Sequence, residues 1–107
     1  MDVCNVINSP KRFYESAEVI HECFQKLGPH IASCHAKDLA WVPEYNVHFA
    51  EAVPGRGQVN YRAYLGELAK LPHDAPLMLE HLKNAAEYDE GRGYIQKVAG
   101  EVGVVFA

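Results

Sequence analysis

Short apolar runs that alternate with longer segments of helical periodicity constrain this chain most strongly. Residues 31–36 and 76–80 are short apolar runs flanked by turn residues, a pattern typical of buried strands. Segments with helical spacing precede, separate and follow these two runs. Strands that alternate with helices favour a parallel sheet in which crossover helices connect the strands. The sequence therefore predicts an α/β fold.

The first helical segment has clear start and stop signals. Ser9 suits the N-cap and Pro10 the first helical position. Gly28 and Pro29 then end the segment. Its apolar residues recur at helical spacing and form one stripe, made of Phe13, Ala17, Ile20, Phe24 and Leu27.

Two further helices are predicted, at 60–71 and after Asn84. Asn84 is followed three residues later by Glu87, which resembles a capping box. Gly91 and Gly93 each cost about 1 kcal/mol inside a helix, so we expect a kink or a frayed middle there. Four tyrosines on these helices are expected to serve packing, namely Tyr61, Tyr64, Tyr88 and Tyr94.

Residues 38–58 show no clean hydrophobic period and contain several turn formers, which are Pro43, Pro54, Gly55 and Gly57. This predicts a long loop, and such loops on small domains are usually functional or disordered. We expect Trp41 to anchor this loop rather than to stack on a ligand.

Composition narrows the functional class. A chain of 107 residues with 49% hydrophobic and 22% charged residues is consistent with one globular domain, residues 1–107. It contains no apolar stretch long enough to cross a bilayer, and its N-terminus lacks the features of a secretory signal. Three widely spaced cysteines without a CxxC motif argue against a disulfide framework. These features favour the cytoplasm.

The charge pattern disfavours a nucleic acid partner. The formal net charge is −4, and the basic residues are scattered rather than gathered in a stripe. Binding to a phosphate backbone depends mainly on clustered Lys and Arg. We therefore expect neither a nucleic acid nor a membrane as partner.

Three residues able to bind a metal follow the predicted strands. Asp2 would end a first strand, His35 lies at the end of the second and Glu80 at the end of the third. His35 follows Asp2 by 33 residues and Glu80 follows His35 by 45, whereas a (β/α)₈ barrel repeats roughly every 31 residues. The predicted loop accounts for the longer interval. Two carboxylates and one imidazole suit Mn²⁺, Mg²⁺, Co²⁺ or Zn²⁺.

Three short motifs, in this order, resemble the closing half of the xylose isomerase-like barrel family, which includes sugar phosphate isomerases and epimerases. They are Cys34-His35-Ala36-Lys37-Asp38, Pro54-Gly55-Arg56-Gly57 and Pro76-Leu77-Met78-Leu79-Glu80-His81. Asp2-Val3-Cys4-Asn5 is similar to the strand end that precedes them in the family. The resemblance implies that the chain is the C-terminal fragment, about the last three βα units, of a (β/α)₈ TIM barrel with parallel strands.

The resemblance also implies a metal-dependent sugar (phosphate) isomerase or epimerase. Asp2, His35 and Glu80 would be the second, third and fourth metal ligands, and Glu80 would also transfer the proton next to the metal-bound carbonyl. The first ligand, a Glu, would lie on an earlier strand that this sequence does not contain. We therefore expect a gene fragment, a shortened version of the protein or half of an assembly, inactive alone.

Other residues are candidates for contacts around that site. Asn5, His48 and Arg56 are expected to bind a small carbohydrate substrate, and Gly55-Arg56-Gly57 precedes a helix that could receive an anion. Lys37, Asp38 and His81 are expected to orient the ligands from outside. A homo-oligomer is compatible with this hypothesis.

Three alternatives stay open. A lyase of the inosose dehydratase type begins with the same proton abstraction, and these residues do not distinguish it from an epimerase. A phosphodiesterase of the endonuclease IV type would need more metal ligands and a basic groove. A small zinc-binding module could use His30, Cys34, His35 and Cys4, although their spacing is irregular for structural zinc.

Overall fold

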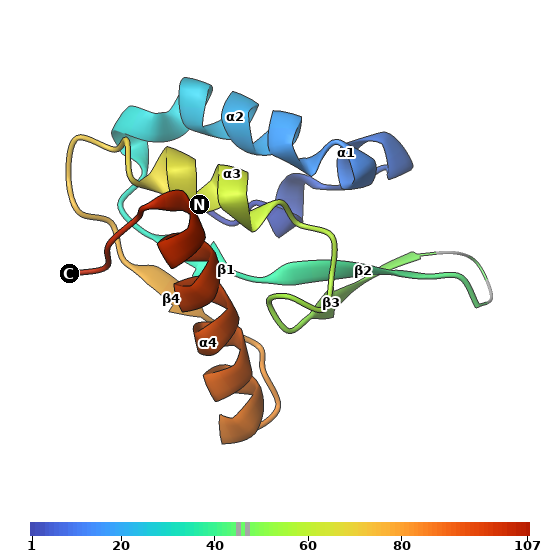
Figure 1. Cartoon of the computed structure of the whole chain (residues 1–107). Coiled ribbons are helices and arrows are strands. Elements are labelled where there is room, and N and C mark those ends of the chain that lie inside the picture. The colour runs from blue at the N-terminus through green and yellow to red at the C-terminus, as the bar shows by residue number, and fades with distance from the viewer. Residues whose placement is uncertain (45, 47) are drawn as a thin grey trace.

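Two short parallel strands lie at the centre of the computed structural model, which describes residues 1–44, 46 and 48–107 (Figure 1). Strand β1 (Cys34–Ala36) pairs with β4 (Leu77–Leu79), with His35 opposite Met78. Met1 flanks the other side of β1: its amino group donates to the Ser33 carbonyl at 2.6 Å and its carbonyl accepts from the His35 N–H at 2.9 Å. This is the bonding pattern of a parallel pair, so the N-terminal segment, β1 and β4 lie side by side in that order.

Helices cover one face of this sheet. Helix α3 (Tyr61–Leu68) lies between α2 (Ser16–Leu27) and α4 (Ala85–Val102), as Figure 1 shows. Cys34 and Ala36 are fully buried beneath the helices, whereas His35 between them is half-buried. Side chains alternate along a strand, so the opposite face of β1 is the one that carries His35. That face is only partly covered, and Met78 beside His35 is 41% exposed.

The first predicted helix is present but interrupted. Ser9 is its N-cap, accepting the Arg12 N–H at 3.3 Å, and Pro10 occupies the first turn as predicted. Helix α1 (Pro10–Tyr14) then ends at Glu15, and α2 begins at Ser16. The buried Ser16 hydroxyl donates to the Gln58 carbonyl and accepts from the Asn60 N–H. These bonds join the interruption to the segment that leads into α3.

The prediction of one long loop over 38–58 is wrong. Residues Asp38–Val42 form β2 and His48–Ala52 form β3, an antiparallel pair with Trp41 opposite Phe49. The hairpin is fixed by an aromatic cluster, in which Phe13 of α1 stacks on Phe49 at 4.8 Å and lies 5.8 Å from Trp41. Trp41 therefore anchors a hairpin, and a shorter loop, 53–60, leads on to α3.

The remaining elements match their predicted positions, with shorter ends. Asn60 caps α3 by accepting the Ala63 N–H at 3.0 Å, and the helix ends at Leu68 rather than Leu71. The predicted frayed middle of α4 is absent, because this helix is continuous for 18 residues. Its Gly91 is buried against Pro54 and Leu79, where a Cβ atom would lie 3.1 and 3.2 Å from their side chains. Close packing explains this glycine.

The fold class is therefore α/β: the described residues form a parallel pair of strands, the antiparallel β2–β3 hairpin and four α-helices. Within residues 1–44, 46 and 48–107 the sheet stays open and does not close into a barrel. None of the helices in this described part is long and apolar enough to span a membrane.

Candidate metal centre

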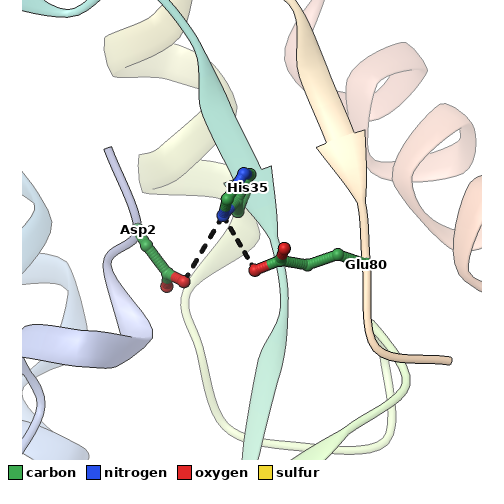
Figure 2. A group of neighbouring side chains, drawn as sticks. All are labelled: Asp2, His35 and Glu80. Carbon is green, nitrogen blue, oxygen red and sulfur yellow. Dashed lines mark ion pairs between the residues drawn. The ribbon is translucent and has the colours of Figure 1, made fainter.

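Asp2, His35 and Glu80 meet on the partly covered face of the sheet, as Figure 2 shows. His35 Nδ1 lies 2.8 Å from Glu80 Oε1 and 3.6 Å from Asp2 Oδ2. One ligand atom from each residue lies within 4.8 Å of the other two. The structure thus brings together the three residues proposed from their places at successive strand ends.

Parallel strands explain this convergence. Asp2 directly follows the residue that pairs with β1, His35 lies within β1, and Glu80 directly follows β4. Asp2 Oδ1 accepts the Cys4 N–H at 3.1 Å, which turns the chain into the short 3-10 helix η1 (Cys4–Val6). The other carboxylate oxygen of Asp2 is thereby directed toward His35 and Glu80.

The donor set fits a divalent cation. Asp2 Oδ2 is buried, and within the described part of the chain it forms an ion pair with Lys37 Nζ at 2.9 Å but no hydrogen bond of acceptable geometry. A buried carboxylate needs a cation beside it, and Lys37 supplies that charge in this structure. Two carboxylates and one imidazole nitrogen are also ligands that several divalent metals accept.

Lys37 supplies a positive charge to the same oxygens. Its side chain is 5% exposed, and Nζ lies 2.7 Å from Glu80 Oε1, 2.9 Å from Asp2 Oδ2 and 3.1 Å from Glu51 Oε1. Lys37 follows His35 by two residues, so both side chains lie on the same face. It thus touches two of the three candidate ligands directly, which is closer than the outer position predicted for it.

These contacts shift the ionisation of both partners. Burial lowers the pKa of Lys37, but its close contacts with the carboxylates of Glu80, Asp2 and Glu51 raise it by more, and the net shift is upward. The hydrogen bond from Lys37 lowers the pKa of Glu80, with a smaller opposing effect of desolvation. At neutral pH the site therefore contains the Lys37 ammonium beside the ionised Glu80 carboxylate.

Two buried tyrosines of α3 hold the β1 backbone in place. The Tyr64 hydroxyl donates to the His35 carbonyl at 2.9 Å, and the Tyr61 hydroxyl donates to the Lys37 carbonyl at 2.8 Å. Burial raises the pKa of both phenols, so they remain donors. The sequence indicated packing for these residues, and the helical stripe gave no signal for the additional hydrogen bonds.

The β2–β3 hairpin and His81 form the outer part of the site. Glu51 of β3 contacts Lys37, and its Oε2 lies 2.9 Å from His81 Nδ1. His81 Nε2 lies 3.8 Å from Glu80 Oε2, and its backbone has a positive φ of 60°. Residues other than glycine rarely adopt this conformation, which is concentrated at functional sites. Glu51 was expected in a loop, and the weak alternation of β3 gave little signal that could have assigned it here.

An open cleft of about 320 Å³ adjoins the cluster and is lined in part by Lys37, Glu51, Glu80, His81 and Arg56. Arg56 does not point freely into it. Its guanidinium forms two hydrogen bonds with Glu90 of α4, at 2.7 and 2.6 Å, and these raise the pKa of Arg56.

Asp38 fixes the backbone beside the site from the opposite, buried face of the sheet. Its carboxylate accepts four backbone N–H groups at 2.9–3.0 Å, those of Leu39, Gly55, Gly57 and Val59. Burial raises the pKa of this carboxyl, and the four donors partly offset that effect. Asp38 therefore shapes the 55–59 loop and does not orient a ligand of the cluster.

Two of the sequence-predicted residues lie apart from the cluster. His48 is exposed at the far end of the hairpin, four residues along β3 from Ala52, or roughly 13 Å at the usual rise. Asn5 is exposed in η1, and the hydrogen bonds described above do not link it to Asp2, His35 or Glu80. In the part of the chain that the structure describes, neither residue forms a hydrogen bond or an ion pair with the cluster.

The ligands of a zinc module also fail to converge. Cys34 is fully buried on the helix side of β1, whereas its neighbour His35 faces the other way. Burial raises the pKa of the Cys4 and Cys34 thiols, which disfavours the thiolate that zinc requires. Among the described residues, Asp2, His35 and Glu80 form the one group of three metal-ligating side chains.

No protein-family model matches this chain, and neither a curated protein nor a solved structure matches it.

Proposed function

We propose that the chain is the C-terminal part of a (β/α)₈ barrel enzyme that isomerises or epimerises sugars or sugar phosphates with a divalent metal. The observation that carries this proposal is the convergence of Asp2, His35 and Glu80 at the ends of neighbouring parallel strands. The carboxyl ends of the strands are where barrel enzymes place their chemistry. The motif order that resembles the xylose isomerase-like family points to the same class.

The arrangement of the sheet is compatible with an arc of a barrel. The N-terminal segment, β1 and β4 run parallel in sequence order, and helices cover only the face opposite the cluster. In a barrel, the face with His35 and Met78 would line the interior. Met78 on this face is 41% exposed, so further strands packed against it would bury apolar surface.

Asp2, His35 and Glu80 would hold the metal, which when bound supplies a Lewis acid for a sugar carbonyl. The protein would move the proton. Glu80 Oε1 is engaged by Lys37 and His35, whereas Oε2 faces His81 at 3.8 Å and lies at the cleft. The lowered pKa of Glu80 keeps it ionised and able to accept a proton from the carbon next to the carbonyl.

Two other activities of the same barrel remain second to this one. A lyase would begin with the same proton transfer to Glu80, and it would then eliminate water instead of returning the proton. A phosphodiesterase acting on DNA would require a basic surface, yet Arg56 beside the cleft is already paired with Glu90. The charge of the chain also disfavours that activity.

Metal binding is the first test. Calorimetric titration of the purified chain with MnCl₂ should show one Mn²⁺ bound, and Glu80→Gln should weaken binding at least tenfold. Glu22→Gln removes the same charge at an exposed helical position paired only with Lys26, and it should bind like the natural chain. Equal affinity of the Glu80→Gln and Glu22→Gln variants would exclude Glu80 as a ligand.

Activity is the second test. The protein translated from the complete reading frame should be incubated with a panel of sugars and sugar phosphates in D₂O, with and without Mn²⁺. Metal-dependent deuterium uptake next to a carbonyl, abolished by Glu80→Gln, is the expected result. Release of water to form an unsaturated product would instead assign the lyase. Full activity of Glu80→Gln would contradict the proposed role of Glu80.

A further inference from the structure

The ammonium group of Lys37 stands against the oxygens that the metal would use. Nζ contacts Asp2 Oδ2 at 2.9 Å and Glu80 Oε1 at 2.7 Å, and the side chain is almost completely buried. Metal–oxygen bonds are shorter, about 2.0–2.2 Å. A cation bound to both oxygens would therefore lie very close to the ammonium at its present position, and the two positive charges would repel each other.

The charges of the site favour binding of a divalent metal while the Lys37 ammonium stays nearby. Three carboxylates, from Asp2, Glu51 and Glu80, face the single ammonium of Lys37. Two negative charges therefore stay uncompensated when the neighbouring His35 and His81 are neutral. A divalent cation supplies two positive charges. The site therefore balances best when it contains both the metal and the ammonium, at separate positions.

Glu51 provides the separate position. Its Oε1 already lies 3.1 Å from Nζ, and its carboxylate is 44% exposed at the edge of the cleft. A long, flexible lysine side chain can move its ammonium toward Glu51 without losing a charged partner. Glu51 belongs to β3, so this movement links the metal site to the β2–β3 hairpin.

We propose that Lys37 is a tethered competitor of the metal: its ammonium occupies the Asp2–Glu80 position in the metal-free chain and moves onto Glu51 when a divalent cation binds. This inference rests on the proposed metal site and adds a residue that sets its affinity. Lys37 would thereby keep the three carboxylates paired while the metal is absent, and it would limit how tightly the metal is held.

Lys37→Met tests this competition, since methionine keeps the unbranched chain and removes the charge. Calorimetric titration with MnCl₂ should show at least tenfold tighter binding than in the natural chain, and Mn²⁺ should raise the melting temperature by more. Lys97→Met removes an exposed lysine of α4 and should leave the affinity unchanged. Unchanged or weaker binding by Lys37→Met would overturn the inference.

If circular dichroism shows that Lys37→Met does not fold, Glu51→Gln supplies an independent test at an exposed residue. Loss of the ammonium's second position should weaken Mn²⁺ binding severalfold. Glu44→Gln removes the same charge elsewhere on the hairpin and should change it less than twofold. Equal effects of these two variants would refute the movement onto Glu51.

The two proposals fail in different ways. If neither the natural chain nor Lys37→Met binds Mn²⁺, the metal site itself is wrong and this inference falls with it. If the natural chain binds and Lys37→Met binds no more tightly, only the competition is wrong. Binding by Lys37→Met alone would overturn the movement onto Glu51, because the ammonium would then block the site instead of yielding it.

Discussion

Replacing Asp38 with Asn should destabilise the fold far more than the loss of a surface charge. Asp38 is 1% exposed, and each of its carboxylate oxygens accepts two backbone N–H groups. Asparagine retains one acceptor oxygen. Its NH₂ group would face two N–H donors, either those of Gly55 and Gly57 or those of Leu39 and Val59.

The expected loss follows from these contacts. Hydrogen bonds to charged groups contribute about 1.5–3 kcal/mol each, so losing two costs about 3–6 kcal/mol. Burial already disfavours the ionised carboxyl and raises its pKa, which places the loss near the lower end, about 3 kcal/mol. Small domains are stable by only about 5–15 kcal/mol. The variant should therefore retain its fold with a much smaller free energy of unfolding.

Urea unfolding measures this loss through Trp41, the single tryptophan of the chain, which lies on β2 with Asp38. With an m-value of about 1–3 kcal/mol/M, the midpoint should fall by about 1–3 M. Asp74→Asn at an exposed turn position should leave it unchanged. A fall of less than about 0.3 M for Asp38→Asn would refute the argument that its carboxylate holds the 55–59 loop.

Two further predictions concern backbone space and pH. Gly57→Ala should lower the urea midpoint, because the added Cβ would lie 2.3 Å from Asp38 Oδ1. Gly93→Ala places its Cβ in open space among the described residues, so it should stabilise the chain by up to about 1 kcal/mol. The opposite order of midpoints would contradict this. The lowered pKa of Glu80 contributes stability that is present above the ordinary carboxyl pKa of about 4.3 and is lost as the pH falls further. The raised pKa of Lys37 contributes stability that is lost above about pH 10.4. Melting temperatures should therefore fall less between pH 7 and pH 3 in Glu80→Gln than in the natural chain, and parallel curves would refute the Glu80 contribution.

Local signals were sufficient to predict most elements. Ser9 and Asn84 each accept a backbone N–H three residues on, as predicted. Asn60, predicted as the first helical residue, is instead the N-cap of α3. The sequence did not reveal the break between α1 and α2, because it depends on hydrogen bonds between Ser16 and residues more than forty positions away.

The β2–β3 hairpin shows why other elements could not be predicted from the sequence. Its strands contain alanines and a buried Asp38, so period-two alternation is weak, and its stability comes from Phe13 packing on Trp41 and Phe49. Such contacts join segments distant in sequence. Missing the hairpin also meant missing Glu51 as a partner of Lys37.

The candidate site could be predicted from the sequence for a physical reason. Parallel strands bring their carboxyl ends to one edge, so residues at equivalent strand positions converge whatever lies between them. The sequence therefore predicted that Asp2, His35 and Glu80 would meet, and the structure places them within 4.8 Å. The direct contacts of Lys37 depended on side-chain geometry that strand positions alone do not specify.

Anomalous diffraction from crystals soaked in MnCl₂ would show directly whether Asp2, His35 and Glu80 bind a metal. A manganese peak is expected about 2.0–2.3 Å from one oxygen of Asp2, one oxygen of Glu80 and a ring nitrogen of His35, with Lys37 Nζ displaced toward Glu51. A manganese-soaked crystal without density between those three side chains would contradict it.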